Sequence, residues 1–165
     1  MIAFNIPDKK DFTSKLFLQD TFDAFMVSQA SFTTNITVSL DGSLHRDYFT
    51  DAEWEEMEQH DFARWPFLKP LCYQIVKGRR LPEHFKIVFM LSRSNTEKLL
   101  SGTGLSISAE QVSGLFLNIR YDQGALQCVT GVSLSSFTPD KSLDRAWDDT
   151  IRRYFRSKEI YWEED

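Results

Sequence analysis

Cysteine is scarce in this sequence. Only Cys72 and Cys128 occur among the 165 residues, and they are too far apart for a Cys-x-x-Cys motif. The spacing therefore indicates neither a disulfide framework nor a set of zinc ligands. We expect two reduced, buried thiols, and we predict no metal site and no cofactor.

Long apolar runs and a positive net charge are also lacking. No stretch approaches the length of a membrane span, and the N-terminal MIAFNIPDKKDF meets charged residues too soon for the apolar core of a secretion signal. We therefore expect a cytoplasmic protein without a membrane partner. The formal net charge of -5 argues against a surface that binds nucleic acid or anionic lipid over its whole extent, but it leaves a local basic patch open.

The sequence motifs of common catalytic sites are missing as well. There is no GxSxG nucleophile elbow, no GxxxxGKS/T phosphate loop and no GxGxxG fingerprint. Each histidine does have an acid nearby, in the pairs His45 and Asp47, His60 and Asp61, and His84 and Glu83. None of these pairs has a metal-binding spacing, which favours surface histidines. A small hydrolase or metal-dependent enzyme is the alternative, and it requires such His and Asp residues to converge in one pocket.

Apolar and aromatic residues are plentiful, with 42% apolar content, 14 Phe and four Trp, which suffices for the core of one globular domain. The patterns run strand, helix, strands, two helices, strand, helix, hairpin, helix. This order predicts an α+β fold with a mainly antiparallel sheet. We expect a single domain over residues 1–158 and a frayed acidic tail over 159–165.

The helices are predicted from apolar periodicity and from capping residues. We expect them near residues 8–18, 51–60, 66–77, 94–101 and 139–157. The proposed caps are Asp8, Thr50 with Glu53, Ser94 with Glu97, and Thr138 before Pro139. In the helix 66–77, one apolar face is predicted to contain Phe67, Leu68, Leu71, Cys72, Ile75 and Val76.

Two hairpins are predicted. The first covers residues 32–48, with its turn at Asp41-Gly42-Ser43, and the second covers residues 114–137. Between them, the strand His84 to Ser92 is apolar on both faces, so we place it at the centre of the sheet.

The register of hairpin 114–137 follows from the pairing that gathers apolar residues on one face. Tyr121 opposite Leu126 achieves this, with a tight turn at Gln123-Gly124. The other face then carries Arg120 beside Gln127, together with Asn118. This mixed face either contacts water, as one side of an antiparallel sheet often does, or binds a protein or nucleic acid.

A second candidate surface is the basic run KGRR, which contains Lys77, Arg79 and Arg80. It could bind phosphate groups. It also follows a predicted helix C-terminus, where cations interact favourably with the helix dipole without any functional role. Further cations that could lie near it are Lys69, Lys86 and Arg93.

Three segments carry a resemblance to a known family: KGRRLPEHFKIVFMLS, GLFLNIRYDQGALQCVTG and SFTPDKSLDRAWDD. Through them the chain resembles a family of uncharacterised bacterial proteins classed as a domain of unknown function. The resemblance runs along nearly the whole chain. It implies a single small soluble bacterial domain, and it carries over no activity, cofactor or catalytic residue.

A second similarity is architectural, because strand, helix and hairpin recur at a spacing of 83 residues, as in the duplicated unit of DNA sliding clamps and related processivity factors. Such an analogy concerns the fold and does not establish function.

The missing catalytic motifs and the polar outer faces of both hairpins favour a non-enzymatic binding or interaction domain. Its partner would be a protein or a nucleic acid, and a clamp-like association with nucleic acid is one version. Self-association is a third hypothesis, beside binding and enzymatic activity.

Overall fold

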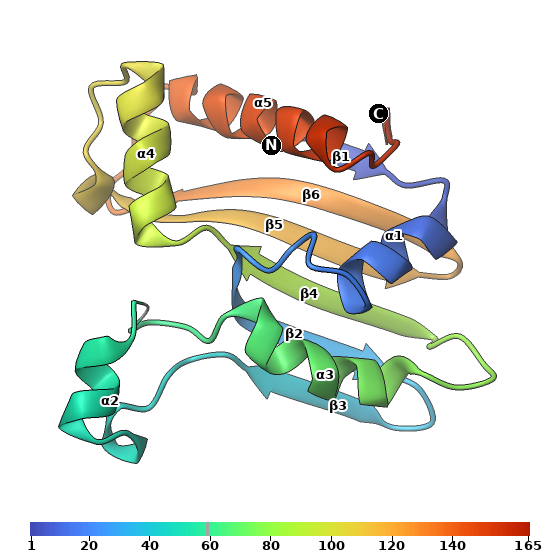
Figure 1. The fold of residues 1–165 in the computed structure, drawn as a ribbon. Coiled ribbons are helices and arrows are strands. Elements are labelled where there is room, and N and C mark those ends of the chain that lie inside the picture. The colour runs from blue at the N-terminus through green and yellow to red at the C-terminus, as the bar shows by residue number, and fades with distance from the viewer. Residues whose placement is uncertain (59) are drawn as a thin grey trace.

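An antiparallel sheet runs through the computed structural model, which describes residues 1–58 and 60–165 (Figure 1). Its seven strands lie in the order β3-β2-β4-β5-β6-β1-β7. They are β1 (Ala3–Asn5), β2 (Met26–Thr33), β3 (Thr37–Asp41), β4 (His84–Met90), β5 (Val112–Asp122), β6 (Ala125–Leu134) and β7 (Glu163–Glu164). The predicted α+β class, the antiparallel sheet and the interior position of β4 are confirmed.

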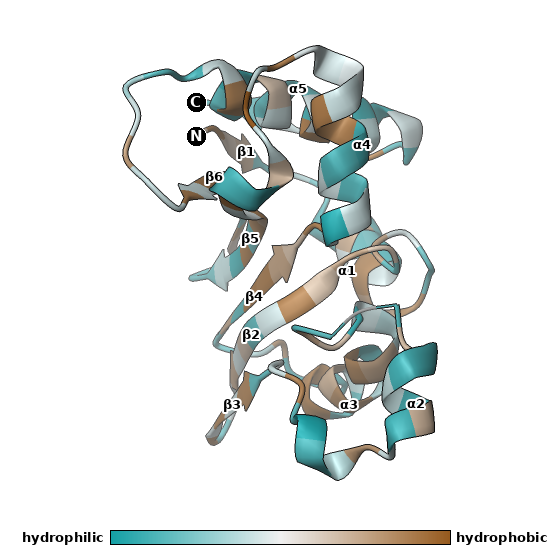
Figure 2. Ribbon diagram, turned by 90° about the vertical axis from the view of Figure 1, so that its left-hand side faces the viewer, coloured by the Kyte–Doolittle hydropathy of each residue, from teal (hydrophilic) through white to brown (hydrophobic). Residues whose placement is uncertain are grey.

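The helices are α1 (Lys9–Phe17), α2 (Asp51–Glu56), α3 (Trp65–Val76), α4 (Arg93–Thr103) and α5 (Ser142–Ser157), with short 3-10 turns η1 (Arg46–Tyr48) and η2 (Ala109–Gln111). In Figure 2, helices α1, α3, α4 and α5 all lie on the same side of the strands. Among residues 1–58 and 60–165, no helix lies against the opposite face of the sheet. In the part of the chain that the structure describes, no helix combines the length and apolar character needed to span a membrane.

The core lies between the helices and one face of the sheet. The central strands supply two adjacent apolar rows to it, Ala30, Ile87, Ile119, Cys128 and Phe4, then Phe32, Phe85, Tyr121, Leu126 and Ile6. Helix α5 adds Leu143, Trp147, Ile151 and Phe155. The indole N–H of Trp147 donates to the carbonyl of Phe116, and that of Trp65 to the carbonyl of Leu16, both at 2.9 Å. The two largest buried rings therefore have their polar atoms paired.

Strands β5 and β6 form the predicted hairpin in the predicted register. Tyr121 pairs with Leu126 and Arg120 with Gln127. The turn residues Gln123 and Gly124 have φ of 49° and 79°, the positive values that a two-residue hairpin turn of this kind requires.

The first hairpin differs from the prediction. Strand β2 begins at Met26, and the chain turns at residues 34–36 before β3 begins. Ile36, which is predicted to lie within a strand, is in this turn and is 62% exposed. The alternation of polar and apolar residues continues through residues 34–36, so the sequence pattern predicts a strand where the chain turns. Gly42 does not form the turn. Its amide N–H donates to the carbonyl of Ser28, and a Cβ there would lie 1.8 Å from the carbonyl oxygen of Val27.

Several helix boundaries also differ. Ser92 caps α4, in place of Ser94, because its hydroxyl accepts from the N–H of Asn95. Helix α5 begins at Ser142, since the Asp140 carboxylate accepts that residue's N–H, and Thr138-Pro139 lies outside the helix.

The faces and ends of the middle helices differ too. Helix α2 ends at Glu56, and residue 59 of the predicted helix lies outside the described residues. On α3, Phe67 and Leu71 are 79% and 50% exposed, so the buried face is narrower than predicted.

The tail of residues 159–165, for which the sequence predicts fraying, contributes an edge strand to the sheet. Glu163 and Glu164 pair with β1 as an edge strand, and Ile160 is 3% exposed. The ring of Trp162 packs against those of Phe4 and Phe155, at centroid distances of 5.7 and 5.9 Å. The tail therefore covers one end of the core.

Candidate functional site

The uncovered face of the sheet carries a row of polar side chains from strand to strand. Cross-strand pairing aligns Ser39, Ser31, Lys86, Arg120, Gln127, Asn5 and Glu163, in the order β3, β2, β4, β5, β6, β1 and β7. Side chains alternate between the two faces of a strand, so these residues point away from the helices while their neighbours enter the core. Two of the predicted binding residues, Arg120 and Gln127, lie in the middle of this row.

Lys86 and Arg120 form a pair of like charges at the centre of the row. They are directly opposite each other on β4 and β5, and both are exposed. Across residues 1–58 and 60–165, neither takes part in an ion pair. The next pair along the same strands is His84 opposite Asp122. Because opposed like charges destabilise a sheet, this cation pair (Lys86 and Arg120) is a feature that an anion would complement.

Amide side chains adjoin the cation pair. The Gln127 amide donates to the Asn5 side chain at 3.0 Å, and the Asn5 amide donates to the Asp165 carboxylate at 2.6 Å. Asn118 lies two residues from Arg120 on β5, and its amide N–H donates to the Val129 carbonyl at 3.2 Å. The predicted residues Asn118, Arg120 and Gln127 are therefore neighbours on one face.

A shallow hollow continues the same face toward the other end of the strands. It has a volume of about 490 Å³ and is open to solvent. Its apolar lining includes Phe62, Val88, Met90 and Phe116, and its polar lining includes Ser28, Gln29 and Asn118. The hollow and the cation pair share β4 and β5, with Asn118 between them.

The KGRR run lies apart from the cation pair. Lys77 is the C-cap of α3, and Arg79 and Arg80 follow on the segment that leads to β4, beyond the end of the sheet (Figure 1). Lys69 and Arg93 do not join it. The Lys69 ammonium contacts the Asp23 carboxylate at 2.7 Å, and the guanidinium of Arg93 contacts Glu97 on α4 at 3.4 Å. Lys86 instead faces Arg120, a neighbour that could not be identified without knowing which strands pair.

The histidines and acids considered for an enzyme are spread along the sheet. His84 begins β4 at the end where it pairs with Thr33, whereas the segments that contain His45 and Asp61 meet beyond the other end of β2. The ring of His60 stacks on Trp54, with 4.5 Å between centroids. Within the described residues, no group of three or more His, Cys, Asp or Glu side chains is placed to hold a metal ion.

Both thiols are free and buried in the core. Burial raises the pKa of Cys72 to about 12, and complete burial also raises the pKa of Cys128. Both side chains therefore stay protonated near neutral pH, where a nucleophilic cysteine would need thiolate character.

The fold and the face together define an α+β domain with a single helical layer and one uncovered sheet face. A family model, described as a family of unknown function (DUF5721), matches residues 15–163, and the chain belongs to this family. No curated protein and no solved structure matches the chain. The architectural similarity to sliding clamps thus finds no support. The order strand, helix, hairpin does recur, first as β1, α1 and the β2–β3 hairpin and then as β4, α4 and the β5–β6 hairpin. The pairing of the two units differs, because β4 pairs with β5 of its own unit whereas β1 pairs with β6 of the other unit.

Proposed function

We propose that this chain is a non-enzymatic binding module whose uncovered sheet face holds an unpaired nucleic acid strand. The observation that carries the proposal is the cation pair, Lys86 and Arg120, which is exposed and has no acid partner in the described residues. Phosphate groups would relieve the repulsion between these two charges. The amides of Gln127 and Asn118 add hydrogen-bonding groups beside them.

The width of the face favours an unpaired strand over a duplex. From β3 to β1 the face spans six strands, or about 24 Å at the usual spacing between strands. The major groove of DNA is about 12 Å wide, and it admits a helix or a two-stranded ribbon. A sheet of this width cannot enter the groove. It can support a single strand, as sheet-based RNA-binding domains do.

The small number of cations predicts weak, salt-dependent binding. Each phosphate neutralised on a single strand contributes a slope of about -0.7 to a plot of log K against log salt concentration, so two contacts give about -1.4. The net charge of -5 opposes any broader electrostatic attraction. We therefore expect binding to be detectable at low salt and to depend on this pair.

Fluorescence anisotropy with a labelled single-stranded oligonucleotide tests the proposal. Lys86→Ala or Arg120→Ala should weaken binding about tenfold and roughly halve the salt slope. The matched control is Lys98→Ala, which removes an exposed cation from α4, a helix of the opposite layer. An equal loss in the control variant, or no binding by the unchanged protein at low salt, would contradict the proposal.

The cellular setting is part of the proposal. We place the protein in the bacterial cytoplasm. Two free, buried cysteines support a reducing compartment, because disulfides are rare there.

A further inference from the structure

We infer that the hollow beside the cation pair receives an unpaired base, so that the uncovered face binds nucleobases as well as phosphates; this inference rests on the proposed function. The hollow is lined by two aromatic side chains and by amide groups, and it shares strands β4 and β5 with the two cations. Single-stranded nucleic acids are bound in this way, with bases stacked on aromatic rings and phosphates held by cations.

The floor of the hollow places two amides on either side of an apolar side chain. Gln29, Val88 and Asn118 occupy one cross-strand row on β2, β4 and β5. The backbones of the two outer strands are about 10 Å apart at this row. Asn and Gln amides are suited to hydrogen-bonding base edges, because each carries both a donor and an acceptor.

Both amides have hydrogen-bonding capacity to spare. Asn118 uses its N–H for the Val129 carbonyl, and its Oδ1 accepts no hydrogen bond within the described residues. That oxygen is not sealed in the interior, because no buried side-chain polar atom there lacks a partner. The amide of Gln29 is exposed on the same row.

Phe116 contributes to the wall of the hollow with its ring over Gly114, and a second glycine leaves space beside the Cβ of Phe116. Gly131 lies opposite Phe116 on β6 and contributes no side chain. A Cβ added at Gly131 would meet its nearest atoms, in Asn118 and Phe116, at 3.8 Å, which is an ordinary contact. A larger residue can therefore occupy this position and fill part of the hollow without a clash at its Cβ.

A nucleic acid strand lying along β5 can reach both the hollow and the cation pair. Phe116 and Arg120 are four residues apart on the same face of this strand, or about 14 Å along the backbone. The long side chains of the cation pair shorten this distance, and a flexible sugar-phosphate chain can bridge the rest. The base would lie over Phe116 and the row of amides while the phosphates contact Lys86 and Arg120.

The test compares a labelled oligodeoxynucleotide with an oligomer of equal length in which every sugar lacks its base. Both carry the same phosphates, so the cation pair alone cannot distinguish them. We expect the unchanged protein to bind the oligomer with bases about tenfold more tightly. Gly131→Val should abolish this preference while leaving binding of the abasic oligomer unchanged. Ser39→Val, on the same face at the sheet edge, is the control and should keep the preference.

The outcomes separate the two proposals. Equal binding of the two oligomers would overturn the base site and leave phosphate binding standing, whereas binding of neither would overturn both. An acidic peptide of equal charge that competes better than the oligomer with bases would overturn them in favour of a protein partner. Thermal unfolding shows whether Gly131→Val folds. Gln29→Ala, at an exposed side chain, provides a second variant that should reduce the preference.

Discussion

Lys86 and Arg120 lie directly opposite each other on β4 and β5, on the face of the sheet that no helix covers. The carboxylate nearest to Arg120 along its own strand is that of Asp122, which is opposite His84 and forms no ion pair among the residues described. A sheet loses stability from two opposed like charges. The nucleic acid strand proposed above would neutralise both charges.

Gly42→Ala should destabilise the fold strongly. The added Cβ would lie 1.8 Å from the carbonyl oxygen of Val27, so the junction between β2 and β3 must shift. We expect a loss of about 2 kcal/mol or more in the free energy of unfolding, measured in urea. Gly102→Ala, where nothing lies within 4 Å of the added Cβ, is the control and should cost nothing. A Gly42→Ala protein as stable as the unchanged one would contradict the geometry of this junction.

The C-terminal tail should contribute to stability. Ile160→Ala leaves a cavity in the core, since this side chain is 3% exposed, and about 2–4 kcal/mol should be lost on unfolding. Tyr161→Ala changes the next residue, which is 64% exposed, and should cost less than about 0.5 kcal/mol. Similar values for the two variants would mean that the tail does not pack as described.

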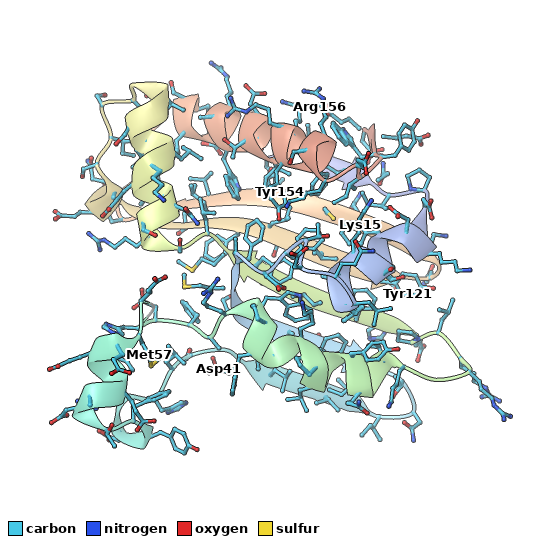
Figure 3. All side chains as sticks on the ribbon, in the orientation of Figure 1. Lys15, Asp41, Met57, Tyr121, Tyr154 and Arg156 are labelled. Atoms are coloured by element: carbon cyan, nitrogen blue, oxygen red, sulfur yellow. The ribbon has the colours of Figure 1, made fainter. Side chains whose placement is uncertain are left out.

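Ionisation of the Tyr154 phenol should lower the free energy of unfolding at alkaline pH. The side chain points from α5 toward the segment between α1 and β2, where its hydroxyl donates to the carbonyl of Thr21 (Figure 3). Burial, followed by the charges of Asp23 and Asp20, raises its pKa from 10.0 to about 12. The phenol ionises more readily in the unfolded chain, so its stabilising effect is complete below pH 10 and is lost as the pH rises toward 12.

Tyr154→Phe isolates this effect. At pH 8 the variant should be less stable by about 1 kcal/mol, the usual net contribution of a hydrogen bond. The difference should shrink at pH 11, because only the unchanged protein loses the contribution of this group. A difference that stays constant over this range, in urea unfolding at both pH values, would show that Tyr154 does not titrate differently on folding.

The two thiols should react slowly in the folded protein. Burial shields both cysteines, and the pKa of Cys72 is raised to about 12. At pH 8 an aromatic disulfide reagent should modify them at the rate of unfolding and should modify both at once in denaturant. Rapid reaction of either thiol under native conditions would contradict their burial.

The hairpin of β5 and β6 was predictable from sequence because its apolar alternation is uninterrupted and Gln123-Gly124 suits a tight turn. The first hairpin was not, since Ile36 continues the apolar pattern where the chain already turns. The cation pair was missed for another reason. The predicted hairpin register identifies Arg120 as outward-facing, but placing Lys86 opposite it requires knowing that β4 pairs with β5. That pairing depends on how the whole sheet packs, which local patterns do not specify.

The most direct test measures stability and oligonucleotide binding together in Lys86→Glu. This change replaces opposed like charges by an opposite-charge pair with Arg120, so the fold should gain about 0.2–1 kcal/mol in urea unfolding. Binding of single-stranded oligonucleotide should fall more than tenfold, whereas Lys98→Glu on α4 should leave it nearly unchanged. A more stable protein that no longer binds is the predicted result. Binding equal to that of the unchanged protein would contradict the assignment of this face.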